Sequence, residues 1–139
     1  MRFIVMVKAT KDSEAGVMPS TQLLEDMTKF NEELAKAGAL LSLDGLHPGF
    51  EGTRVSFSGG RPAVMDGRLA EGKAVVGGYW MIESKSKEEA VEWAKRCPAA
   101  DGDVIEVRRV FEISEFPKDV REAADNPTVR ARLEKRKAS

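Results

Sequence analysis

The sequence predicts a single α+β domain with an antiparallel sheet, and three observations support this. Apolar or alternating segments bounded by turn residues have the composition of strands. Two segments between them repeat apolar residues at helical spacing. The predicted order is strand, helix, strand, hairpin pair, helix, strand, which is the split β-α-β pattern of ferredoxin-like folds with an added hairpin. The length of 139 residues matches one domain.

The first strand and helix have clear signals. Residues 2–8 form a continuous apolar run, which predicts a strand buried on both faces. Ser20 is a suitable N-cap and Gly38 a suitable C-terminal stop for a helix. The apolar residues between them follow steps of four, three and four: Leu23, Met27, Phe30 and Leu34.

A second strand and a hairpin follow. Residues 39–46 predict a strand, and residues 53–57 alternate polar and apolar side chains. Gly59-Gly60 predicts a tight turn, with a return strand at residues 62–65.

The second half of the domain repeats the pattern. After a loop from Asp66 to Lys73, residues 75–82 predict a central strand. Residues 86–89 match a capping box, and the helix that they open stops before Pro98. Residues 104–113 then predict a last long strand.

We assign residues 1–115 to this domain and residues 116–139 to a polar helical extension in two pieces, the second opened by Asn126-Pro127. Basic residues in the extension suggest a nucleic-acid arm. Acidic residues interrupt them, however, and residues 118–139 contain no aromatic side chain to stack on bases, so a solvated helix is the favoured interpretation.

The strands at residues 2–8 and 75–82 are apolar on both faces, whereas the two helices can cover only one face of the sheet. An exposed apolar sheet face is unfavourable in a soluble monomer. A second copy of the chain is the simplest cover, so we expect a homodimer joined through the sheet face.

Composition excludes several classes of function. The formal charge of −1 gives no field that would attract nucleic acid or a membrane. The N-terminal apolar run is too short for a signal peptide or a membrane span. The single cysteine, Cys97, fits a reducing compartment, so we expect a cytoplasmic protein. One histidine and one cysteine cannot form a zinc site, and no cofactor motif is present.

Four separated motifs resemble the YCII-related family, and specifically its DGPF-domain branch. They are Gly45-Leu46-His47-Pro48, the loop at 64–73, Gly77-Gly78-Tyr79-Trp80-Met81-Ile82 and the helix at 90–98. The resemblance covers roughly residues 1 to 113. It implies a dimeric α/β-barrel assembly, in which two ferredoxin-like units join through their sheets.

The chain departs from the family pattern at several positions. Arg68 and Leu69 replace the proline and phenylalanine of Asp-Gly-Pro-Phe, and Gly72 stands where threonine is usual. Some family members have a proposed His-Asp pair with the histidine in the first helix. Met27 occupies the matching region, and no histidine lies between Ser20 and Gly38.

Two residues are candidate catalytic groups. Asp66, followed by Gly67, can be a base or ligand anchor at a strand end, or a turn residue whose carboxylate bonds to its own loop. His47, the only histidine, can titrate near neutrality, or it can be a loop residue with a satisfied hydrogen bond.

Four residues are candidate ligand-binding groups. Gly67, Glu71 and Lys73 belong to the same loop, and Tyr79 can line a pocket. The alternatives are solvated loop charges for Glu71 and Lys73, and a place in the core for Tyr79.

Two hypotheses follow. The first is a dimer that binds a small organic molecule in a pocket between sheet and helices, with isomerase-like or lyase-like chemistry in which Asp66 is the acid-base group. The second is a non-catalytic regulatory or interaction protein, associated with an extracytoplasmic-function sigma factor as the resemblance implies.

Overall fold

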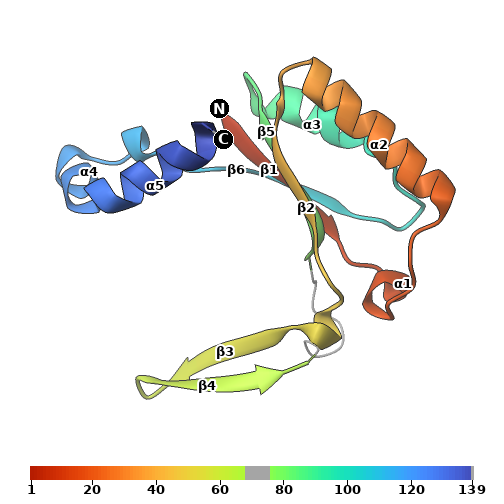
Figure 1. Ribbon diagram of the computed structural model, residues 1–139, viewed down its shortest axis with the longest axis horizontal. Coiled ribbons are helices and arrows are strands. Elements are labelled where there is room, and N and C mark those ends of the chain that lie inside the picture. Colours follow the sequence, from red (N-terminus) through yellow and green to blue (C-terminus); the bar gives the residue numbers. More distant parts are fainter. Residues whose placement is uncertain (68–75, 139) are drawn as a thin grey trace.

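The computed structural model describes residues 1–67 and 76–138, and it confirms the α+β fold. Its main sheet is antiparallel, with strands in the spatial order β2 (Leu40–Gly45), β5 (Val76–Glu83), β1 (Arg2–Lys8) and β6 (Ile105–Arg109). A helix connects β1 to β2 and another connects β5 to β6 (Figure 1). This order and these connections are the ferredoxin-like arrangement.

Both connecting helices, α2 (Thr21–Lys36) and α3 (Lys87–Lys95), lie on the same side of the sheet (Figure 1). The predicted N-caps are confirmed, because Ser20 Oγ accepts from the N–H of Leu23 and Ser86 Oγ accepts from the N–H of Glu89, each at 3.1 Å. The capping box at residues 86–89 is only half formed, because the Glu89 carboxylate accepts from the N–H of Lys85 and not from that of Ser86. The chain leaves α2 through Gly38, whose φ of 72° suits glycine.

The core fills the space between these helices and the sheet. Its largest fully buried side chains are Phe3, Val5, Leu34 and Ile82. Trp80 is also buried, and its ring meets Phe30 edge to face at a centroid distance of 5.3 Å. The indole Nε1–H of Trp80 donates to Asn31 Oδ1 at 2.7 Å, so the one polar group of this ring is satisfied.

Cys97 lies at the edge of this core and is buried. Burial raises the pKa of its thiol to about 11, with a smaller contribution from the negative charge of Asp103. The thiol is therefore protonated near neutrality, as expected of a buried cysteine that packs in the core.

The hairpin of β3 (Thr53–Ser58) and β4 (Arg61–Asp66) forms at the predicted place. Its turn residues Gly59 and Gly60 have φ of 59° and 78°, as a two-residue turn of this type requires. The hairpin does not join the main sheet. It forms a separate two-stranded sheet that projects away from α2 and α3 (Figure 1).

Three local features differ from the prediction. A one-turn helix α1 (Lys11–Glu14), capped by Thr10, and a 3-10 turn η1 (Gly49–Glu51) lie in segments for which no element was predicted. The last strand is shorter than residues 104–113. Its backbone pairing ends when the N–H of Val110 donates to the Arg2 carbonyl, and the chain then turns through η2 (Ile113–Glu115).

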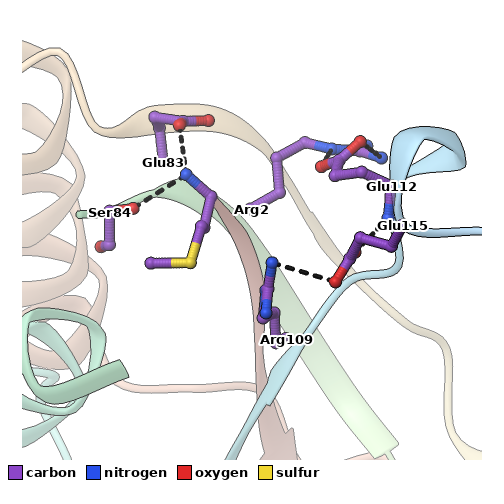
Figure 2. Close-up of polar contacts among 7 residues, drawn as sticks. Arg2, Glu83, Ser84, Arg109, Glu112 and Glu115 are labelled. Carbon is purple, nitrogen blue, oxygen red and sulfur yellow. Dashed lines mark hydrogen bonds and ion pairs between the residues drawn. The ribbon is translucent and has the colours of Figure 1, made fainter. Parts of the chain in front are cut away.

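The strand stops there because its partner β1 begins at Arg2, and ion pairs hold the chain where it leaves the sheet (Figure 2). Both Nε and Nη2 of Arg2 donate to the Glu112 carboxylate, at 2.7 and 3.1 Å, and Arg109 pairs with Glu115 at 3.0 Å. We call these four residues the β6 clamp. It fixes the direction in which the chain leaves the sheet toward α4 (Lys118–Ala124) and α5 (Pro127–Ala138), the two helical pieces predicted for the extension.

Candidate functional site

The four-stranded sheet has a second face, turned away from α2 and α3, which we call the open face. Strand register shows which residues it carries. Met6 lies opposite Tyr79 on β5 and Glu106 on β6, and Ile4 lies opposite Met81 and Arg108. The central residues of this face are half-buried, whereas those on the two outer strands are exposed. The open face therefore has an apolar centre and polar margins.

A phenol and a carboxylate meet on this face. Tyr79 lies opposite Asp44 of β2, and its Oη donates to Asp44 Oδ2 at 2.6 Å. The hydrogen bond from the phenol to Asp44 raises the pKa of Tyr79, and burial and the negative charge of Asp44 act in the same direction. The phenol therefore stays protonated and keeps its proton directed at the carboxylate.

Asp66 is the last residue of β4, at the base of the hairpin. It is exposed and lies opposite Thr53, whose Oγ1 donates to Asp66 Oδ1 at 2.7 Å. The N–H of Gly67 donates to the Gly52 carbonyl at 2.9 Å, one step beyond this pair. The Asp66-Gly67 dipeptide thus closes the hairpin and also presents a carboxylate at a strand end.

His47 follows β2 in the loop that leads to the hairpin. Its side chain is 90% exposed, and Nδ1 lies 2.8 Å from Glu51 Oε2 across the η1 turn. His47 and Asp66 have different partners, Glu51 and Thr53, so they do not form a His-Asp pair with each other.

The structure thus divides the predicted site residues into two places. Asp66, Gly67 and His47 belong to the hairpin base and the loop before it, whereas Tyr79 belongs to the sheet. The predictions for Glu71 and Lys73 lie outside the described residues.

Asp44 is the polar residue that sequence reasoning missed. It stands at the end of the strand segment Leu-Leu-Ser-Leu-Asp-Gly, where a carboxylate is unusual. That anomaly was a usable signal, but its partner is 35 residues away in the chain, and only strand register brings the two together.

Two open surface depressions lie elsewhere. One, of about 510 Å³, is formed where Lys8–Lys11 meets Asp101–Val104. The other, of about 480 Å³, is lined by residues at the sheet end that include Met1, Phe3 and Arg109.

Within residues 1–67 and 76–138, no cluster of three or more His, Cys, Asp or Glu side chains could hold a metal ion. In the same residues, no helix has the length and apolar character needed to cross a membrane.

The fold and the open face define the class: a ferredoxin-like α+β domain whose two connecting helices, α2 and α3, cover one side of the sheet. The family model of the YCII-related domain matches residues 1–114, and the chain belongs to the YCII-related family. The match ends within η2, so helices α4 and α5 lie beyond it. No curated protein matches the chain.

Proposed function

We propose that this protein is a homodimer joined through its open face, and that the dimer binds a small polar organic molecule against Tyr79 and Asp44. The observation that supports this most directly is the placement of the Tyr79–Asp44 pair beside the apolar centre of a face that the chain's own connecting helices do not cover. A mostly apolar surface with a few placed polar groups is the usual composition of a ligand site.

The dimer follows from the chemistry of the open face. Ile4, Met6 and Met81 lie side by side on its central strands. Pairing this face with the same face of a second copy removes apolar surface from water in both protomers. A two-fold axis makes such a contact self-complementary.

The ligand is assigned to the open face because the other side of the sheet is filled. Phe30, Leu34, Trp80 and Ile82 are all buried between the helices and the sheet. We therefore place the proposed pocket on the surface that bears Tyr79 and not in the space between sheet and helices. There, Asp44 can accept a hydrogen bond from a ligand N–H or O–H, and the Tyr79 oxygen can accept another.

Catalysis of the isomerase or lyase kind is the further step, and Asp66 is its proposed acid-base group. Its support is an exposed carboxylate held at a strand end by Thr53. If this role is correct, Asp66→Asn abolishes turnover of any substrate found for the protein while leaving its dimerisation unchanged.

A non-catalytic role is the second candidate, and one observation favours it. His47 and Asp66 are engaged with different partners, and α2 has no histidine that could supply a His-Asp pair. The DGPF-domain resemblance then supports association with an extracytoplasmic-function sigma factor. Both roles fit a cytoplasmic protein, which the free Cys97 supports. A pull-down with the full chain that recovers no transcription protein would argue against the second role.

The dimer is tested by light scattering and sedimentation at micromolar protein concentration. We expect the mass of two chains for the native sequence. Met6→Glu, which places a charge at the centre of the open face, should weaken association about tenfold or more. Leu24→Glu adds the same charge to an exposed apolar position on α2 and should leave association unchanged. A native chain that sediments as a single protomer rules out this assembly.

The ligand is tested by a thermal-shift screen against small polar organic molecules. We expect at least one compound to raise the Tm of the native dimer and to lose most of this effect with Tyr79→Phe, which removes only the hydroxyl. A compound that stabilises native protein and Tyr79→Phe equally binds somewhere else.

A further inference from the structure

One apolar face of the β3–β4 hairpin is exposed, and the other residues that the structure describes do not cover it. Register places Val55 opposite Val64 and Phe57 opposite Pro62, and alternation along each strand directs these four side chains to one face. Phe57 is 75% exposed and Val64 is 68% exposed. The other face is mixed, because it carries Ser56, Ser58 and Arg61 but also Ala63 and Met65. We call the first set the arm face.

An isolated two-stranded hairpin is marginally stable in water, because each strand has a partner on one edge only and little apolar surface is buried. Here the turn and the base are well formed: Gly59-Gly60 closes one end, and the Thr53–Asp66 and Gly67–Gly52 bonds close the other. The side chains between these ends supply the apolar surface. A hairpin with well-formed ends and an exposed apolar face is typical of a contact surface.

The direction of the hairpin indicates what covers it. It projects to the side of the sheet away from α2 and α3, which is also the side of the open face (Figure 1). Strands of six residues reach roughly 20 Å. A second copy seated on the open face lies within that reach.

The size of the open face also favours a contact between the hairpin and the second copy. Four strands spaced about 4.8 Å apart, paired over five to seven residues, give a flat footprint of roughly 400 Å². A standard interface buries about 800 Å² on each partner. The margins of the open face are polar, at Asp44, Glu106 and Arg108. The sheet face alone is therefore a small interface, and the two arms of a symmetric dimer would enlarge it.

We propose that the β3–β4 hairpin is an arm that packs its apolar face, Val55, Phe57, Pro62 and Val64, against the second copy of the chain. This inference rests on the proposed homodimer. Two-fold symmetry gives two such contacts in each dimer, one from each protomer. Ser56 and Arg61, on the opposite face of the hairpin, remain in water.

The test is the dimer dissociation constant, measured by sedimentation equilibrium for two matched variants of the full chain. Phe57→Glu places a charge on the arm face, and Ser56→Glu places the same charge on the adjacent residue of the opposite face. We expect Phe57→Glu to raise the dissociation constant about tenfold or more, and Ser56→Glu to change it less than about twofold. Equal effects of the two substitutions overturn the proposal.

Amide hydrogen exchange gives a second readout that does not depend on a substitution in the hairpin. If the arm packs on the partner, protection of β3 and β4 in the native chain rises with protein concentration and is lost in Met6→Glu. Protection that is independent of concentration overturns the arm. These results also separate the two proposals. A monomeric native chain refutes the homodimer itself, whereas a native dimer that Met6→Glu weakens and Phe57→Glu does not weaken refutes only the arm.

Discussion

The two faces of the four-stranded sheet use the same strands for different purposes. On the helix side, Phe3, Val5 and Ile82 are nearly inaccessible to water and pack against α2 and α3. On the open face, Ile4, Met6 and Met81 alternate with them along the same strands but remain half-buried. The apolar pattern is similar on both faces, so the difference comes from what lies over each one. The first face provides the stability of the protomer, and the second is the face on which we propose that the partner and the ligand bind.

The largest expected effect compares adjacent residues on opposite faces. Ile82 is 1% exposed on the helix side, so Ile82→Ala should lower the free energy of unfolding by about 3 kcal/mol, through lost burial and the cavity left behind. Met81→Ala should cost less, and its cost should grow with protein concentration, because association into the proposed dimer would add stability by mass action. Urea denaturation at two concentrations measures both. Equal, concentration-independent losses would show that the two faces are equivalent.

A smaller effect is expected at the β6 clamp, which fixes where the extension leaves the sheet. The hydrogen bond from Arg2 lowers the pKa of Glu112 below its ordinary value, and the positive charges of Arg2, the N-terminus and Lys137 add to this. Because the folded state has the lower pKa, the stabilisation is fully present above the ordinary carboxyl pKa of 4.5 and is lost as the pH falls through the folded value.

Glu112→Gln should therefore destabilise the fold at neutral pH by about 0.5 kcal/mol, a modest figure because the pair is partly exposed. The difference from the native chain should vanish in acid. Glu92→Gln is the control, since it removes the more exposed ion pair with Lys95 on α3. Chemical denaturation between pH 3 and pH 7 measures both profiles. A loss that persists unchanged at the lowest pH contradicts the ionic origin.

The smallest expected effect is a change in the pKa of Tyr79 on the open face, which is measured spectroscopically. Tyr79 is the only tyrosine in the chain, so ultraviolet absorption titrates it without interference from another phenol. Its pKa is raised above the ordinary value of 10.0, chiefly by the bond to Asp44. Asp44→Asn should shift the midpoint back toward 10.0, whereas Asp26→Asn, a carboxylate on α2 bonded to Gln22, should not. Identical midpoints in native protein and Asp44→Asn would mean that the pair is not formed in solution.

Much of the fold could be predicted because its signals are local. The caps at Ser20 and Ser86, the stop at Gly38 and the turn at Gly59-Gly60 act within a few residues of themselves, and all four are confirmed. The predicted last strand is longer than the observed one because the alternation of apolar residues continues to Ile113. Its true end depends on Arg2, more than a hundred residues earlier in the chain.

The candidate site was less predictable than the fold. Asp66 and Gly67 were recognisable as a strand-end dipeptide, and they occupy that position. Asp44 was not recognised as a site residue, since the role of a single carboxylate in a strand cannot be inferred before its neighbour across the sheet is known. The hairpin was predicted as a pair of strands, but nothing in its residues indicated that it would stand apart from the main sheet.

The sequence by itself determined the identity and order of the elements and the apolar character of both sheet faces, because backbone preferences and side-chain periodicity are properties of short segments. Only the tertiary structure decided which face the helices cover, where β6 ends and which carboxylate meets Tyr79. These outcomes depend on contacts between segments tens of residues apart, whose geometry is set when the strands pair in register.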